Sequence, residues 1–316
     1  MIWCTIKGYD LYNFPFDFVG KDAGNHKNSQ SGKIWSLVNE IHLHGLLSMA
    51  SSPTRLVRLL ATIPSLILLA IRLKINSACI HYLTSKYYYT LDEEERRRFL
   101  ISNIWGAAPG GNWNRALEEV YASRPEFTEV REPLIDAIVS LGDDEYDGVI
   151  EIGTGNGWFL DLLSKKIDRN IPFIGLDLNR ETIERTRSRY GKSRKLEFVC
   201  SDILSFTKTE SLTHKLLVTC FVLECFSPEE LVGLCALLKR EAPCHLAIIE
   251  RVNSTHEAEA LSKPIGGFSY SHDYEMILKR AGIEKQYSRK DTAKNPGSNF
   301  NLTAVFKAVP ESRTCQ

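Results

Sequence analysis

The chain has 316 residues, of which 43% are hydrophobic and 25% are charged, so it is long enough to bury a sizeable globular core. Its 39 Lys and Arg residues balance 39 Asp and Glu residues, which excludes a strong overall field that would attract nucleic acid. The eight cysteines form no CxxC pair and no histidine stands at zinc-finger spacing, which favours free thiols in a reducing compartment and no metal site.

Residues 1–30 mix aromatic side chains with Gly, Asn, Lys and Ser and show no sustained period, which predicts an irregular or flexible amino-terminal segment. The first residues lack the basic flank, apolar core and small-residue cleavage site of a secretory signal. We therefore expect a cytoplasmic protein.

A basic and apolar stretch follows at residues 41–91, where no acidic residue occurs and five Lys or Arg residues surround an apolar run at 59–71. The thirteen residues of that run are fewer than the roughly 20 that span a bilayer. The pattern favours a buried helix, and the alternative is peripheral contact with an anionic membrane surface through residues 41–91.

Residues 31–140 are predicted to form a mainly helical accessory region. Thr90 is expected to cap a helix with Glu93 as its capping-box partner. The sequence AAPGGNW at 107–113 is expected to break the helical pattern, because Pro and Gly are poor helix formers. Amphipathic helices then resume until the sequence changes character near residue 140.

Over residues 141–309 short apolar runs alternate with amphipathic stretches, which predicts strands joined by helical crossovers. Seven strands can be counted, so we expect an α/β fold with a seven-stranded sheet and helices on both faces. The stretch 271–282 is predicted to be a helix that starts at Ser271 and ends at Gly282. Residues 310–316 are expected to be a flexible tail.

The first of these strands runs directly into a loop with three glycines, at Gly153, Gly155 and Gly157. Glycines at this spacing let the backbone turn tightly and approach a ligand without an intervening Cβ. A dinucleotide fingerprint is disfavoured, because its spacing is GxGxxG and the residue after Gly157 is the bulky Trp158.

The ExGxGxG pattern that begins at Glu151 resembles the signature loop of class I S-adenosylmethionine (SAM)-dependent methyltransferases, and the order of elements is similar to their seven-stranded fold. The resemblance implies SAM as the cofactor. It places Glu151 in the region of the cofactor's amino acid, although a carboxylate that caps the loop's own amides explains Glu151 equally well. The loop residues implied in cofactor binding are Glu151, Gly153, Thr154, Gly155, Asn156 and Gly157.

The next strands end in acidic residues that fit the same resemblance. Asp177, followed by Leu178, closes the second strand, where a carboxylate can accept both hydroxyls of a ribose. Asp202 and Ile203 follow the third strand, at the family's adenine site, and the alternative for Asp202 is an Asx turn. Cys220 and Phe221 end the fourth strand, where family members line the transferable methyl group, although core packing also explains them. The chain lacks the [DN]PP[FY] motif of the amino-methylating subgroup at this point, which disfavours nucleobase N-methylation.

No catalytic residue is obligatory, because the sulfonium is already activated and a base is needed only when a proton must leave. Candidate bases are Glu224, His256 and His272, each of which a structural role explains as well.

The resemblance implies that the region before residue 140 caps the acceptor, with Trp105, Trp113 and Tyr121 as candidate wall residues. We expect O- or C-methylation of a small, lipophilic acceptor. The alternatives are a protein methyltransferase and a non-catalytic SAM-fold scaffold.

Overall fold

A computed structural model describes residues 5–6, 9–10, 87–123, 126–191, 193–252, 261–266, 268–292 and 300–310 of the chain. The chain divides into two compact units. The first comprises residues 1–99 with 266–268, and the second comprises residues 100–265 with 269–316. The expectations for residues 11–86, including the apolar run and its membrane alternative, lie outside the described residues and stay predictions.

In the first unit, β1 (Thr5–Ile6) pairs with β2 (Tyr9–Asp10), and α5 spans Glu93–Phe99. The expected cap of α5 is wrong by two residues. Asp92 Oδ1 accepts from Glu95 N at 2.8 Å and Glu95 Oε2 accepts from Asp92 N at 3.3 Å, so Asp92 fills the position expected for Thr90. Among the described residues, no helix has the length and apolar character needed to cross a membrane.

The second unit is built on one mixed sheet that confirms the seven predicted strands. The strand order is β10-β11-β7-β6-β3-β4-β5. Strands β3 to β7 are parallel to one another, whereas β11 runs antiparallel to both β7 and β10. The strands are β3 Gly148–Ile152, β4 Phe173–Asp177, β5 Leu196–Cys200, β6 Lys215–Cys220, β7 Cys244–Val252, β10 Glu284–Thr292 and β11 Phe300–Ala308.

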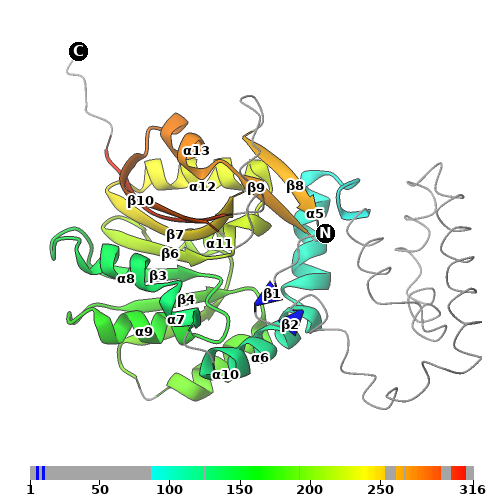
Figure 1. Cartoon of the computed structure of the whole chain (residues 1–316), viewed down its shortest axis with the longest axis horizontal. Coiled ribbons are helices and arrows are strands. Elements are labelled where there is room, and N and C mark those ends of the chain that lie inside the picture. The colour runs from blue at the N-terminus through cyan, green and yellow to red at the C-terminus, as the bar shows by residue number, and fades with distance from the viewer. Residues whose placement is uncertain are drawn as a thin grey trace, which may run out of the picture. The chain divides into compact units, whose positions relative to one another are not determined.

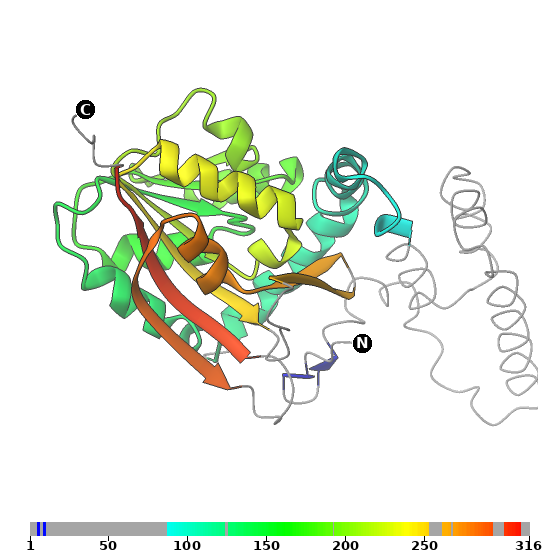
Figure 2. The same cartoon turned by 90° about the horizontal axis from the view of Figure 1, so that it is seen from above.

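Helices cover both faces of this sheet, as expected for parallel strands that are apolar on both sides (Figure 1; Figure 2). Alternate residues of one strand point to opposite faces, so Val149 packs into one core and Ile150 into the other. One face carries α8 (Glu132–Val139), α9 (Trp158–Lys166) and α10 (Arg180–Tyr190). The other carries α11 (Ile203–Phe206), α12 (Pro228–Arg240) and α13 (Tyr274–Arg280).

The predicted helix break at residues 107–113 is wrong. A π-helical turn, η2 (Leu100–Ile104), ends before Trp105, and α6 then runs over Ala108–Ser123 through both glycines, followed by α7 (Glu126–Glu129). Proline is tolerated in the first turn of a helix, where its missing N–H would have no partner. Tertiary contact fixes the break earlier, because Asn179 Nδ2 donates to Trp105 O at 3.1 Å and Ala107 O at 2.7 Å.

The predicted helix start at Ser271 is also wrong. Residues 269–272 form β9 (Ser269–His272), which pairs with β8 (Ser262–Gly266). The helix α13 begins at Tyr274, and its cap is Asp273, whose side chain accepts from Met276 N. The expected end of the helix is confirmed, because Gly282 follows it with a φ of 71°.

Candidate functional site

The predicted site residues come from the carboxyl ends of β3, β4, β5 and β6, which the parallel pairing brings to one edge of the sheet. The first of these ends is the glycine loop. Gly153, Gly155 and Gly157 have φ values of 71°, 52° and 74°, in the left-handed region that other residues adopt only with strain. Gly157 is the N-cap of α9, and as a glycine it adopts the left-handed conformation from which the helix starts.

A different part of the fold lies against each end of this loop. A Cβ on Gly153 would meet Val222 Cγ2 at 2.5 Å, and a Cβ on Gly155 would meet Asn114 Oδ1 at 2.9 Å. Val222 follows strand β6, whereas Asn114 belongs to α6. The loop is therefore bare for two reasons, its backbone conformation and the close approach of these neighbours.

Glu151, the acid of the motif, is buried with 4% of its surface exposed. Its Oε2 accepts from Thr154 Oγ1 at 2.6 Å, so the carboxyl group is tied to the loop itself. Burial raises its pKa to about 8, although the Thr154 hydroxyl and the Arg131 guanidinium both act to lower it. Both functions considered for Glu151 remain open, because the loop contact uses only part of its capacity to accept hydrogen bonds.

Arg131 is a charged residue of this site that the sequence did not reveal. It precedes α8, is only 4% exposed, and acts on the pKa values of Glu151 and Cys220. Its guanidinium lies over aromatic rings, 5.4 Å from the centroid of Trp158 and 6.0 Å from that of Phe221. A single Arg before an amphipathic helix carries no sequence signal, so only the fold brings this cation to the edge of the sheet.

Asp177 lies beside the loop, as the order of motifs predicts. Its Oδ2 accepts from Gly155 N at 3.0 Å and its Oδ1 accepts from Asn179 N at 2.8 Å. Burial raises the pKa of this carboxyl, and these backbone donors oppose the shift. A carboxylate can accept about four hydrogen bonds, so Asp177 keeps some capacity for a further donor. Leu178 follows at partial exposure, and its carbonyl accepts from Cys200 Sγ at 3.6 Å.

Asp202 caps the short helix α11, so the Asx-type alternative describes its local geometry. Its oxygens accept from Ser205 N at 2.9 Å and from Ser205 Oγ at 2.8 Å. The residue stays partly exposed at the sheet edge, whereas Ile203 is 2% exposed and packs into the core beneath it. Asn156 likewise bonds to the backbone nearby, since its Oδ1 accepts from Trp158 N at 3.0 Å.

The fourth strand ends in a strained turn. Phe221 has a φ of 59°, which is uncommon for a bulky residue, and its N–H donates to Ile249 O at 2.8 Å. Burial raises the pKa of the neighbouring Cys220 thiol to about 12, so that group is neutral at physiological pH. Together these residues present a neutral surface at the end of β6.

Of the candidate bases, two are engaged in contacts of their own and His256 lies outside the described residues. Glu224 is buried in a two-pronged ion pair with Arg251, whose Nε lies 2.7 Å from Glu224 Oε2. His272 is fully buried, with Nε2 3.1 Å from Phe226 O and Nδ1 2.7 Å from Ser262 Oγ. Because a carbonyl only accepts, Nε2 carries the proton and Nδ1 accepts from the serine, which leaves the ring no free lone pair.

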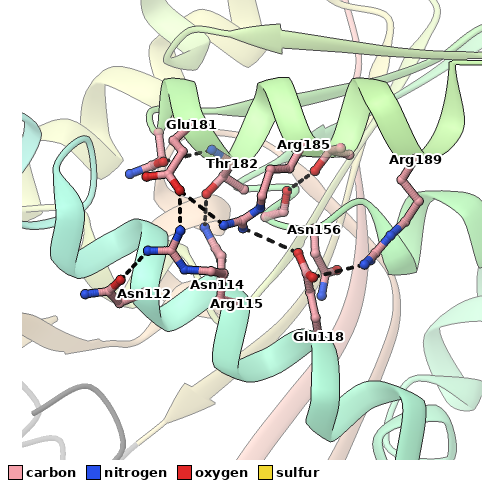
Figure 3. A network of polar contacts seen from close by, with 12 residues as sticks. Asn112, Asn114, Arg115, Glu118, Asn156, Glu181, Thr182, Arg185 and Arg189 are labelled. Carbon is pink, nitrogen blue, oxygen red and sulfur yellow. Dashed lines mark hydrogen bonds and ion pairs between the residues drawn. The ribbon is translucent and has the colours of Figure 1, made fainter. Parts of the chain in front are cut away.

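A polar network fixes α6 beside the loop (Figure 3). Glu118 on α6 bridges Arg185 and Arg189 on α10, at 3.4 and 2.9 Å. Asn114 Nδ2 donates to Thr182 Oγ1 at 3.3 Å. Each of these partly exposed ion pairs contributes about 1 kcal/mol at most, but several together favour one placement of α6 on α10. Trp105 and Trp113 are partly exposed at this side, so they stay candidates for an acceptor wall, and nothing is described of the Tyr121 side chain.

The strand order with the reversed β11 is the α/β Rossmann-like fold of class I SAM-dependent methyltransferases, as the resemblance implies. Residues 149–241 match the family model described as a methyltransferase domain, so this part of the chain is a methyltransferase domain. Among the described residues, no three His, Cys, Asp or Glu side chains are placed to hold a metal ion.

Solved structures resemble the chain in fold at low identity. The N-methyltransferase NodS from Bradyrhizobium japonicum WM9 is 18% identical, with 59% of this chain and 98% of that chain covered and a TM-score of 0.46. A SAM-dependent methyltransferase from Aquifex aeolicus is 23% identical, with 54% and 88% covered and a TM-score of 0.40. One from Mesorhizobium loti is 14% identical, with 56% and 97% covered and a TM-score of 0.40. No curated protein matches the sequence, and none of these structures identifies an acceptor.

Proposed function

We propose that this chain transfers the methyl group of SAM to a small-molecule acceptor, on oxygen or carbon. The observation that supports the proposal best is the contact between the bare glycine loop and the Asp177 carboxylate, which accepts from Gly155 N at 3.0 Å. The two elements are distant in sequence, and their contact forms a cradle with a hydrogen-bonding acid at its rim.

The residues present fit a SAM molecule part by part. The carboxylate of Asp177 suits the ribose hydroxyls, and Asp202, partly exposed at the next strand end, suits the adenine amino group. Arg131 supplies a buried positive charge that suits the cofactor's carboxylate. Glu151, beneath the loop, suits the amino end of the same amino acid.

When bound, the sulfonium supplies an activated methyl group. The chain's own residues therefore have only to position the acceptor and exclude water. Cys220 and Phe221 form an uncharged wall at the end of β6, which favours an apolar acceptor. The described candidate bases are held in other contacts, which favours an acceptor that loses its proton to water or has none to lose.

The two alternatives from the sequence are a protein methyltransferase and a scaffold that binds SAM without turnover. They differ from the proposal in where the label from methyl-labelled SAM accumulates. The purified full chain is incubated with labelled SAM and with metabolite and protein fractions of the same cells, and SAM binding is measured in parallel by calorimetry.

We expect label in the small-molecule fraction, and less of it with Asp177→Ala at a SAM concentration near the wild-type Kd. Label in protein alone would replace the proposal with protein methylation. Binding without labelled product in either fraction would favour the scaffold, and a chain that binds no SAM would overturn the proposal altogether.

Liposome flotation of the full chain tests the peripheral membrane contact proposed for residues 41–91, and recovery only in the soluble fraction would contradict it.

A further inference from the structure

A second buried acid, Glu250, lies at the same edge of the sheet and has no part in the proposed cofactor contacts. It belongs to β7, is 0% exposed, and points to the face covered by α12 and α13, opposite to the face of Glu151. Its neighbours include the Glu224 carboxylate and the Tyr274 hydroxyl, both of which are also buried. Burial raises the pKa of Glu250 to about 8, and a carboxyl group in such a place is costly unless it is hydrogen-bonded.

The Glu250 carboxyl accepts from three consecutive backbone amides. Oε1 lies 3.1 Å from Val222 N and 3.0 Å from Leu223 N, and Oε2 lies 3.3 Å from Glu224 N. Thr219 Oγ1 adds a fourth contact at 3.3 Å. The three amides open the short helix η3 (Leu223–Cys225), where N–H groups have no partner within the helix. One side chain therefore holds the whole turn that follows β6.

That turn connects the acceptor side of the site with the donor side. It begins at Phe221, whose left-handed backbone is strained and persists only when its surroundings hold it. Strand β7 holds it twice, through the Ile249 carbonyl and through Glu250. On its other side the turn places Val222 Cγ2 2.5 Å from the position that a Cβ of Gly153 would take, so Val222 packs closely against the glycine loop.

We propose that Glu250 is a positioning residue that sets the turn 221–224 and, through Val222, the glycine loop, so that acceptor wall and donor cradle keep one relative placement. The effect on methyl transfer rests on the proposed function, whereas the effect on the turn does not. Glu250 is not a base in this scheme, because both of its oxygens are occupied by the turn and no part of it is exposed.

The experiment compares Glu250→Gln and Glu250→Asp with Glu197→Gln, a matched change at an exposed glutamate of β5. Hydrogen exchange of the Val222, Leu223 and Glu224 amides is the first readout. We expect exchange in Glu250→Gln to be at least ~10-fold faster than in the wild type, since an amide side chain cannot accept from all three donors. Glu250→Asp keeps the carboxyl group and should restore part of the protection, and Glu197→Gln should leave it unchanged.

The second readout separates positioning from general stability. With the wild-type acceptor assay in hand, Glu250→Gln should lower kcat by ~10-fold or more while the Kd of S-adenosylhomocysteine changes by less than ~3-fold. Wild-type exchange rates in the turn of Glu250→Gln, or an unchanged kcat, would overturn the inference. Should Glu250→Gln fail to fold, the same two readouts on Glu250→Asp decide it. Failure of the wild type to bind S-adenosylhomocysteine would instead overturn the proposed function and leave the exchange result standing.

Discussion

Asn114 of the accessory helix α6 lies directly against Gly155 of the cofactor loop, with its Oδ1 2.9 Å from the position that a β-carbon would take. The accessory region thus reaches the loop by contact, and α6 belongs to the same compact unit as the sheet. The division after residue 99 places α6, α7 and α8 with the sheet, whereas the change from helical to alternating sequence pattern predicts a boundary near residue 140.

Gly153 should be more sensitive to substitution than Gly155, because their neighbours differ. Gly153→Ala would meet two methyl groups of Val222 at 2.5 and 2.9 Å, whereas Gly155→Ala would meet the movable end of one amide. Both carry the cost of a left-handed backbone, about 1 kcal/mol or more. We expect Gly153→Ala to lower the free energy of unfolding by roughly 1 to 3 kcal/mol more than Gly155→Ala does, as measured by urea titration. Equal losses would show that the Val222 contact relaxes freely.

The Asp177→Ala substitution tests the ribose contact. Removing hydrogen bonds to a charged acceptor costs roughly 1 to 3 kcal/mol, so the Kd of S-adenosylhomocysteine should rise about 10- to 100-fold in calorimetry. The matched control is Asp168→Ala, an exposed carboxylate at the opposite end of α9 from the loop, which should leave the Kd unchanged. An unchanged Kd in Asp177→Ala would place the residue outside the pocket.

The Arg131→Met substitution tests whether the buried guanidinium binds the amino-acid end of the cofactor. Methionine keeps an apolar side chain between the rings of Trp158 and Phe221 but removes the charge. We expect weaker binding of S-adenosylhomocysteine by about 10-fold or more, and unchanged binding of methylthioadenosine, which lacks the amino acid. Parallel losses for both ligands would mean that Arg131 only supports the fold.

The raised pKa of Glu151, about 8 against a usual value of 4.5, predicts a pH dependence of stability in the ligand-free protein. Between pH 4.5 and 8 the unfolded chain releases this proton while the folded chain retains it, so the free energy of unfolding should fall as the pH rises through this window. Below pH 4.5 the group is protonated in both states, and the full contribution to stability is present.

Comparison with Glu151→Gln isolates this contribution, because Asp177 and Glu250 have pKa values shifted in the same direction and stay in both proteins. The slope of unfolding free energy against pH should be flatter in the variant by up to about 1.4 kcal/mol per pH unit. Urea titrations at several pH values within the window measure it, and parallel curves for the two proteins would contradict the raised pKa.

Residues that are close in sequence determined much of what could be predicted. The three glycines and the acids after successive apolar runs marked the edge of the sheet, because strand ends and glycine turns are local features. The seven strands followed from the same local alternation of apolar and amphipathic stretches. Cofactor contacts assigned to these residues stay predictions that the substitutions above will test.

Features that depend on partners distant in sequence follow from the folded structure and not from local sequence. The hydrogen bonds of Asn179 place the helix break before the Pro-Gly sequence. The pairing of β8 with β9 makes Ser271 part of a strand, where a helix start was expected. Arg131 and Glu250 look like ordinary surface charges in the sequence, yet both are buried at the edge of the sheet. Burial of a charge depends on hydrogen bonds and rings contributed from remote segments, and no local pattern of residues encodes those encounters.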